Sequence, residues 1–305
     1  MSSERVAFLG AGAVGCYFGG MLARAGVPVT LIGRAGHVEA IRRDGLYLER
    51  ADFQGYIPID ASTEMDAVRD AGIVFVCVKT TETETAAAAL VPHLAPGALV
   101  VSFQNGVDNV ERMRSAAGIT AIPSVVYVAC AMSGPGQVKH HGRGETVIGG
   151  PSAAADRIAH VFEVAQVPCR VTGNIASEQW TKLVMNCAYN AISALTHARY
   201  RFLAEDPAIL DVMRDLIREV VAVGKAANVV LPDAEQLTAA AVRLGESMAE
   251  ATSSTEQDIS RGRPTEIDSL NGYVMRRGKE LGVSTPVNST VHALVKFTER
   301  AAQAR

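Results

Sequence analysis

The chain has 305 residues, of which 48% are hydrophobic and 20% charged, so it can bury a large core and is long enough for two domains. A net charge of -3 and scattered arginines without interleaved aromatic residues argue against a nucleic-acid partner. The first residues, MSSERVAFLGAGAVG, lack a basic segment followed by an apolar segment and a cleavage site, and no apolar run is long enough to span a bilayer. We therefore expect a cytoplasmic protein whose partners are small molecules.

The cysteines and histidines indicate neither a disulfide framework nor a metal site. The five cysteines are odd in number, contain no CxxC pair and lie in apolar segments, which is typical of reduced thiols: Cys16, Cys77, Cys130, Cys169 and Cys187. The seven histidines include no HExxH motif, and adjacent His140 and His141 have no cysteine or carboxylate at ligand spacing. We expect no metal.

The first half of the chain alternates short β-rich runs with helical patterns, which is the signature of βαβ units in a parallel sheet. The expected strands are residues 5–10, 27–33, 71–79, 97–103 and 119–128. The expected helices are residues 13–25, 38–44, 81–93 and 107–115, and Thr81 followed by Glu84 has capping-box spacing. From Val125 to Gly149 the pattern changes to short strands with GPGQ and HGRGE as turns, which predicts an antiparallel extension of the sheet.

Strand signals stop after Arg170. Long helical patterns then begin at Ala176, Pro207, Asp233, Glu266 and Pro286. The sequence therefore predicts an α/β fold in which a Rossmann-type, doubly wound domain for NADP, residues 1–172, precedes an all-helical substrate-binding and catalytic domain, residues 173–305. We expect the ligands in a cleft between the two domains.

The sequence GAGAVG places Gly10, Gly12 and Gly15 in a complete GxGxxG motif between a strand and a helix. Gly10 permits a tight turn, Gly12 lets backbone amides approach a pyrophosphate, and Gly15 brings the helix close to the strand. Ala13 and Val14 begin that helix and belong to the same predicted cofactor site. The alternative is a glycine-rich turn with tight helix packing, but the flanking strand and helix favour nucleotide binding.

Arg34 follows the second predicted strand, where an NAD-binding protein usually has Asp or Glu for the ribose hydroxyls. A guanidinium group can pair with a 2′-phosphate through charge-assisted hydrogen bonds. The position therefore favours NADPH over NADH, and the alternative is an exposed arginine in a turn.

Lys79 lies at the carboxyl end of the third predicted strand and Asn105 follows the fourth, at the same rim of the sheet. Lys79 is either a phosphate or ribose contact or a solvated lysine at a strand end. Asn105 belongs to an NG pair, which is ordinarily a turn signal, but this position also places its amide near a nicotinamide or a substrate. Both readings stay open for each residue.

The helix predicted from Ala176 carries two different stripes. Residues at helical spacing form an apolar face: Trp180, Leu183, Val184, Cys187 and Ala191. Lys182, Asn186 and Asn190 are four residues apart and lie along a second stripe. A solvent face is one interpretation, but asparagine is a poor helix former and is used twice here. We favour a polar, partly buried site.

A second concentration of polar residues lies between Ser253 and Tyr273. Glu266 follows Pro264 and precedes an apolar helical pattern, so taken alone it is a carboxylate favoured by the helix dipole. Ser254 taken alone is an ordinary surface hydroxyl.

Three motifs resemble those of the ketopantoate reductase family, the 2-dehydropantoate 2-reductases. They are GAGAVG near the start, KxxxNxxxN from Lys182, and RGRPTEIDSLNG from residue 261. The resemblance covers nearly the whole chain, and TEIDSLNG is its most specific piece because related dehydrogenases share the glycine motif and a KxxxN helix but lack this one.

The resemblance implies an NADP-dependent oxidoreductase acting on a CH–OH group, which reduces 2-dehydropantoate to pantoate for pantothenate and coenzyme A synthesis. Lys182 matches the family's general acid, and Glu266 matches its active-site carboxylate, which helps to bind substrate. Substrate-binding positions match Asn186, Asn190 and Ser254, with Asn105 a further candidate, and cofactor-side positions match Gly10, Gly12, Gly15, Arg34, Lys79 and Asn105. Gln104 departs from the family pattern, in which His often precedes this Asn, and the change bears on the shape of the nicotinamide pocket.

Two other functions are compatible with the motifs. One is a paralogous NADPH-dependent reductase of another 2-oxo acid, and the other is an NADPH-binding sensor without enzymatic activity. A sensor would have no need for Lys182, Asn186, Asn190 and Glu266 together, so their joint presence favours an enzyme. The sequence does not fix the oligomeric state, and a homodimer is one option.

Overall fold

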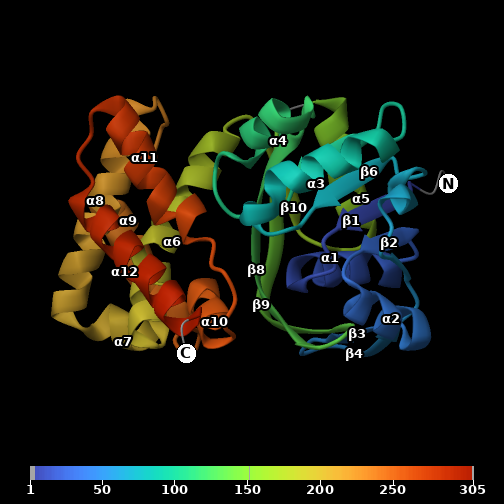
Figure 1. Cartoon of the computed structure of the whole chain (residues 1–305), viewed down its shortest axis with the longest axis horizontal. Coiled ribbons are helices and arrows are strands. Elements are labelled where there is room, and N and C mark those ends of the chain that lie inside the picture. Colours follow the sequence, from blue (N-terminus) through green and yellow to red (C-terminus); the bar gives the residue numbers. More distant parts are fainter. Residues whose placement is uncertain (1–3, 151, 304–305) are drawn as a thin grey trace. The chain divides into compact units, whose positions relative to one another are not determined.

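The computed structural model describes residues 4–150 and 152–303, which form two compact units within Met1–Ile175 and Ala176–Arg305. In the first unit, helices and strands alternate around a largely parallel sheet, and the described part of the second contains helices (Figure 1). The predicted fold class, a Rossmann-type α/β domain followed by a helical domain, is confirmed.

The first unit is built on four central parallel strands. Their spatial order is β7-β6-β1-β2, with bounds β1 Val6–Leu9, β2 Val29–Ile32, β6 Ile73–Val76 and β7 Leu99–Ser102. Each of these strands has four residues, and nearly all of their side chains are buried. Continuous burial is typical of a parallel sheet whose two faces are both covered by helices.

Successive side chains of β1 point to opposite faces of the sheet, and each face has its own core. Val6 and Phe8 belong to the core that includes α1 (Ala13–Arg24) and α5 (Ala153–Val164), whereas Ala7 and Leu9 belong to the core that includes α3 (Thr83–Leu90) and α4 (Asn109–Ala117). Figure 1 shows α3 and α4 on one side of the sheet and α1 on the other. α2 (Ala35–Asp44) adds to the first core. The chain is thus doubly wound.

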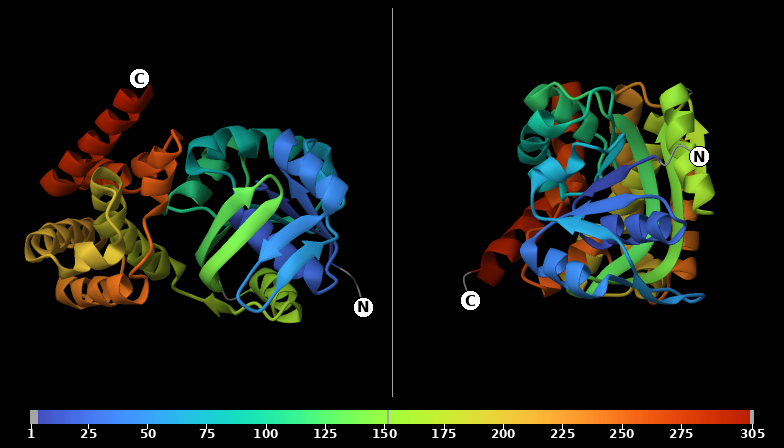
Figure 2. Two further views of the ribbon diagram at one scale, coloured as in Figure 1. Left: turned by 90° about the horizontal axis from the view of Figure 1, so that it is seen from below. Right: turned by 90° about the vertical axis from the view of Figure 1, so that its right-hand side faces the viewer.

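A long, curved antiparallel ribbon extends this sheet, as Figures 1 and 2 show. It consists of β8 (Ile122–Gly134) and β9 (Gln137–Gly149), with the predicted GPGQ turn between them. HGRGE is not a turn, which corrects the prediction. It lies within β9, where Gly142, Arg143 and Gly144 have positive φ and the register with β8 shifts, so these residues form a bulge in a continuing strand.

Several short elements were not predicted. The missed strands are β3 (Leu46–Glu49), β4 (Gln54–Ile57), β5 (Asp60–Ser62) and β10 (Cys169–Thr172). Runs of three or four residues contain too few alternations to show a period of two. The predicted third strand and the helix after it differ from the structure. β6 ends three residues before Lys79, and α3 begins at Thr83. Glu84, predicted to complete a capping box with Thr81, instead pairs with Arg112 at 2.7 Å.

In the described part of the second unit, the helices predicted from Ala176, Pro207, Asp233 and Pro286 begin within one residue of those positions, whereas the short helices Tyr200–Glu205 and Ser254–Ser260 were not predicted. Their bounds are α6 Ile175–Thr196, α7 Tyr200–Glu205, α8 Pro207–Ala226, α9 Ala234–Ser247, α10 Ser254–Ser260, α11 Asn271–Leu281 and α12 Pro286–Gln303. Asp206 caps α8 and Asp233 caps α9, which explains why both starts could be predicted. The helix start predicted at Glu266 is wrong, because Glu266 precedes the 3₁₀ turn η4 (Ile267–Ser269) and α11 begins five residues later.

We expect Gly15→Ala to destabilise the first unit. A Cβ atom on Gly15 would lie well under 3.0 Å from the backbone carbonyl oxygen of Gly10, so helix or strand must shift. Overpacking of this kind costs about 1–3 kcal/mol in the free energy of unfolding, which urea titration measures. Gly36→Ala in α2 is the control, because its Cβ would meet nothing within 4 Å. Equal stability of the two variants would contradict the assignment of Gly15 to a tight contact.

Candidate functional site

The predicted cofactor-side residues of the first unit lie at one edge of its sheet. Gly10 follows β1, Arg34 follows β2, Lys79 follows β6, and Asn105 follows β7. Because these four strands are parallel neighbours, their carboxyl ends meet at the same edge, which is where doubly wound sheets bind ligands. Residues nearly one hundred positions apart in the sequence are thereby brought together.

The glycine turn has the shape of a phosphate cradle. Gly10 has φ +118°, and a Cβ there would lie 2.7 Å from the carbonyl carbon of Cys77, so only glycine is accommodated. Gly12 precedes α1, and a Cβ on it would meet nothing within 4 Å, which leaves space above the first turn of the helix, at Ala13 and Val14. The amides of this turn are therefore a suitable site for a pyrophosphate.

Arg34 lies at the N-terminus of α2 and is highly exposed, with 85% of its side chain accessible. Its Nη2 atom is 3.3 Å from the Oε1 atom of Glu82, whose side chain is 50% exposed. An exposed ion pair of this kind contributes at most about 1 kcal/mol, so the guanidinium group can exchange Glu82 for another anion at little cost.

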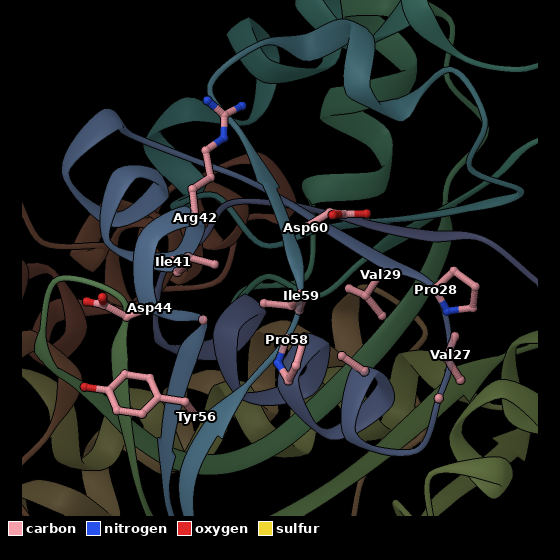
Figure 3. Close-up of a pocket in the computed structure, with 13 residues that line it drawn as sticks. Val27, Pro28, Val29, Ile41, Arg42, Asp44, Tyr56, Pro58, Ile59 and Asp60 are labelled. Carbon is pink, nitrogen blue, oxygen red and sulfur yellow. The ribbon is translucent and has the colours of Figure 1, made fainter.

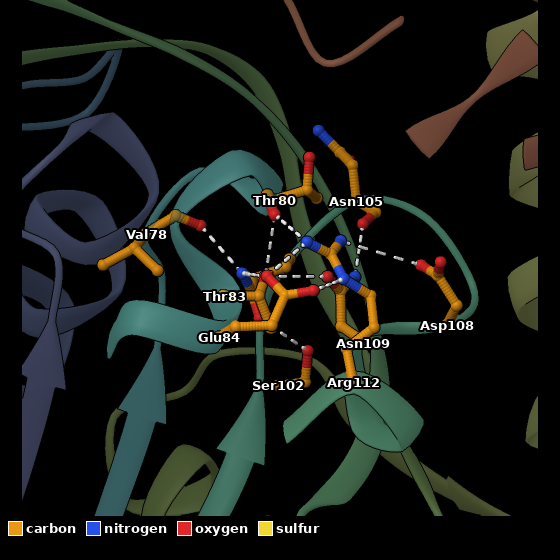
Figure 4. A network of polar contacts seen from close by, with 10 residues as sticks. Val78, Thr80, Thr83, Glu84, Ser102, Asn105, Asp108, Asn109 and Arg112 are labelled. Atoms are coloured by element: carbon orange, nitrogen blue, oxygen red, sulfur yellow. Dashed lines mark hydrogen bonds and ion pairs between the residues drawn. The ribbon is translucent and has the colours of Figure 1, made fainter. Parts of the chain in front are cut away.

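A partly buried hydrogen-bond network holds the loops that follow β6 and β7 (Figure 4). Gln104 donates from Nε2 to the Val78 carbonyl at 3.1 Å and to the Thr83 hydroxyl at 2.8 Å. Asn109 is 3.1 Å from the same hydroxyl and donates from Nδ2 to the Asn105 carbonyl at 2.6 Å. Gln104, which stands where the family often has His, thus belongs to a network that fixes the Asn105 backbone. Thr83 and Asn109, which complete this network, were not predicted from the sequence.

In the second unit, α6 carries the predicted polar stripe. Lys182 and Asn186 are partly exposed, whereas Asn190 is only 3% exposed. Trp180 and Cys187, both predicted for the apolar face, are buried. The stripe therefore passes from a partly open position at Lys182 into the core of the unit at Asn190.

The start of α10 is hydrogen-bonded to α6. Ser253 caps α10 by accepting from the Glu256 amide at 3.0 Å, and its hydroxyl donates to the Asn190 carbonyl at 3.2 Å. The Ser253 amide donates to Ser193 at 3.2 Å. Ser254, the predicted substrate contact, is the next residue and is exposed. Ser253, the neighbour that the sequence interpretation overlooked, thus fixes the backbone that precedes Ser254 on α6. A serine preceding an acidic helical turn was the available signal.

The segment around Glu266 is held to α12. Glu299 accepts the amide of Thr265 at 2.8 Å. Asp268 interacts with His292 at 2.7 Å and with Lys296 at 2.9 Å. Glu266 lies between these two anchored residues and is partly buried.

The same segment is also hydrogen-bonded to α6. Asn271 is fully buried and donates from Nδ2 to the Cys187 carbonyl at 3.2 Å and to Asn288 Oδ1 at 3.0 Å. Asn288 in turn donates to Glu219 at 2.8 Å. The segments that carry Glu266 and Ser254 are therefore both hydrogen-bonded to α6, at Cys187 and Asn190.

A cavity of about 620 Å³ lies elsewhere in the first unit (Figure 3). It is lined by Val27, Pro28 and Val29 at the start of β2 and by Asp60 at the start of β5. This is the amino-terminal edge of the sheet, opposite the glycine turn. The predicted cofactor site therefore does not coincide with this cavity.

Among residues 4–150 and 152–303, no group of three or more His, Cys, Asp or Glu side chains is placed to hold a metal ion. No helix in the same part of the chain is long and apolar enough to cross a membrane.

Comparison with known proteins identifies the family. Residues 6–152 match the family described as "Ketopantoate reductase PanE/ApbA", and residues 174–299 match "Ketopantoate reductase PanE/ApbA C terminal". The chain belongs to the ketopantoate reductase family. It is 30% identical to the 2-dehydropantoate 2-reductase of Pyrococcus abyssi over 303 residues, which cover 97% of this chain and 98% of that protein.

Solved structures agree with this family assignment. The crystal structure of a PanE/ApbA family ketopantoate reductase from Ralstonia eutropha JMP134 is 47% identical with a TM-score of 0.94, covering 98% of this chain and all of that one. The ternary structure of D-mandelate dehydrogenase with NADH and anilino(oxo)acetate shares the fold, with 24% identity, a TM-score of 0.91 and coverage of 98% of this chain and 100% of the other. The predicted family is confirmed, and the chain is an oxidoreductase that acts on a CH–OH group.

The family motif RGRPTEIDSLNG makes the stability of the second unit depend on pH. Hydrogen bonds from His292 and Lys296 and their charges hold the pKa of Asp268 well below its usual 3.8, although burial opposes this shift. A carboxyl group whose pKa is lower in the folded state stabilises the fold above its unfolded pKa, and this contribution is lost as the pH falls toward the folded pKa.

We expect Asp268→Asn to lower the free energy of unfolding by about 1 kcal/mol at neutral pH, a value reduced for the partial exposure of the pair. The difference from the unmodified protein should begin to shrink as the pH is lowered from about 5 to about 3, because Asp268 takes up a proton there in the unfolded chain while its carboxylate in the folded protein stays ionised. Urea unfolding across this range measures it. Asp215→Asn, which removes an exposed partner of Arg218, is the control. A difference that stays constant with pH would show that the carboxylate charge is unimportant.

Proposed function

We propose that this protein reduces 2-dehydropantoate to pantoate with NADPH, as a cytosolic step of pantothenate and coenzyme A synthesis. One observation carries the proposal: two separate segments, bearing Glu266 and Ser254, are hydrogen-bonded to α6 at the level of its asparagine stripe. A helix that served only as core would have no use for this concentration of polar groups. The 2-dehydropantoate 2-reductase relative supports the choice of substrate.

The proposed cofactor site lies in residues 1–172. Gly10, Gly12 and Gly15, together with Ala13 and Val14, would hold the pyrophosphate, because the turn is open at Gly12 and closed at the other two glycines. Arg34 would pair with the 2′-phosphate, while Lys79 and Asn105 would contact the cofactor from the next two loops. The bound nicotinamide would supply the hydride.

The proposed catalytic residues lie in residues 173–305. Reduction of a ketone creates an alkoxide, which Lys182 would stabilise electrostatically and then protonate from its ammonium group. Glu266 would help to bind the substrate. Asn186, Asn190 and Ser254 would orient its oxygen atoms, and Asn105 is a further candidate for substrate binding.

The direct test mixes purified protein with NADPH and 2-dehydropantoate and follows nicotinamide absorbance, with NADH and other 2-oxo acids in parallel. Oxidation confined to NADPH and 2-dehydropantoate supports the proposal. Oxidation with a different 2-oxo acid alone would instead make this chain a reductase of that acid, and binding without any turnover would favour a sensor.

We expect Lys182→Ala to reduce turnover by about 100-fold or more, since general acid catalysis alone is worth about 10²–10⁴-fold. Affinity for NADPH should be retained, and calorimetric titration measures it. Lys279→Ala removes an exposed lysine from α11 and is the control. Equal losses of turnover and NADPH binding would remove Lys182 from the proposed role.

We expect Arg34→Ala to weaken NADPH binding about tenfold or more while changing NADH binding little, because a hydrogen bond to a charged group contributes about 1.5–3 kcal/mol. Dissociation constants for both cofactors measure the effect. Arg43→Ala, near the other end of α2, removes a guanidinium that pairs with Asp44 and is the control. Weakening that is the same for both cofactors would contradict the 2′-phosphate assignment.

A further inference from the structure

Gln104 lies between two loops that carry proposed cofactor contacts. Its side chain is bonded to the carbonyl of Val78, which immediately precedes Lys79, and its backbone immediately precedes Asn105. One amide group therefore links the loop after β6 to the loop after β7.

Both the NH₂ group and the oxygen of the Gln104 side chain have hydrogen-bond partners. Both N–H bonds have acceptors, the Val78 carbonyl at 3.1 Å and the Thr83 hydroxyl at 2.8 Å, and Oε1 lies 3.3 Å from the hydroxyl of Ser102. Thr83 is fully buried and Ser102 is 3% exposed. Buried polar groups without partners are costly, so a side chain lacking any of these donors or acceptors forces the loops to rearrange.

The network continues from Gln104 back to the loop that carries it. Thr83 lies 3.1 Å from Asn109 Oδ1, and Asn109 Nδ2 donates to the Asn105 carbonyl at 2.6 Å. Asn109 is 3% exposed. The backbone of Asn105 is thus fixed from two directions, through its preceding residue and through its own carbonyl group.

We propose that Gln104 is a positioning residue that sets the spacing of Lys79 and Asn105 and thereby places the nicotinamide end of the cofactor for hydride transfer. This inference rests on the proposed function, in which both residues contact that cofactor. Gln104 acts on the cofactor through these loops. Its loss should therefore leave the adenosine end, held by Arg34 and the glycine turn, unaffected.

Gln104→Glu is the most informative variant, because it keeps the shape of the side chain but replaces the donating NH₂ with an oxygen. An acceptor would then face the Val78 carbonyl, and the two loops should separate. Gln104→His retains at most one of the two donated bonds, so it should give a smaller effect. Gln166→Glu makes the same chemical change at an exposed position of the first unit and is the matched control.

The experiment measures the affinities for two ligands and the rate of hydride transfer. Adenosine 2′,5′-bisphosphate carries the 2′-phosphate but no nicotinamide, so titration with it and with NADPH separates the two ends of the site. Single-turnover oxidation of NADPH by 2-dehydropantoate measures hydride transfer at saturating ligand. For Gln104→Glu we expect bisphosphate affinity within about twofold of the unmodified protein and hydride transfer at least tenfold slower, with Gln104→His in between.

Unchanged hydride transfer in Gln104→Glu would overturn the proposal. So would a parallel loss of bisphosphate affinity, NADPH affinity and thermal stability, because that pattern describes a general structural role. If the unmodified protein reduces no 2-oxo acid, the proposed function fails while the binding comparison still decides this inference. A selective loss of NADPH affinity relative to the bisphosphate would support it, and an unchanged ratio would overturn it.

Discussion

The close contact between α1 and the end of β1 is the constraint on which the first unit depends. Because Gly15 has no Cβ, the first turn of α1 can pack against the Gly10 carbonyl, and because Gly10 has none, the turn can pack against Cys77 after β6. These contacts place the N-terminus of α1 at the carboxyl edge of the sheet, among the loops after β2, β6 and β7. The parallel order of four short strands then determines which residues accompany it.

The second unit brings its functional side chains together in a different way, because a set of helices has no common strand edge at which such side chains meet. Here the buried hydrogen bonds from Ser253 to the Asn190 carbonyl and from Asn271 to the Cys187 carbonyl fix two irregular segments on α6. Carbonyl groups within a helix already accept from the next turn, so these are second bonds that use the remaining lone pairs. They determine the register of both segments along α6 without interrupting the helix.

Most long helices could be predicted from the sequence, although α5 was missed despite its cap at Ser152, and the short or tertiary elements could not be predicted. The helices starting at Pro207 and Asp233 were predicted within one residue because each has a side-chain cap. The strand of three residues at Asp60 and the bulge at Gly142 depend on neighbouring strands, which a local pattern does not contain. In the site, helical spacing indicated Lys182 and the family resemblance indicated Glu266, whereas the anchoring roles of Ser253, Asn109 and Asn271 follow from contacts between distant segments.

These anchors change how the motif RGRPTEIDSLNG should be read. Three of its polar residues have structural partners. Thr265 is hydrogen-bonded to Glu299, Asp268 is paired with His292 and Lys296, and Asn271 is hydrogen-bonded to Cys187 and Asn288. A match to the motif therefore indicates first that the segment is hydrogen-bonded to α6 and α12, and only then that it has a catalytic role. The proposed chemistry depends on Glu266, which lies between two of these anchors. Replacing an anchor should thus displace Glu266 as well as destabilise the unit, and loss of activity in such a variant would not by itself make the anchor catalytic.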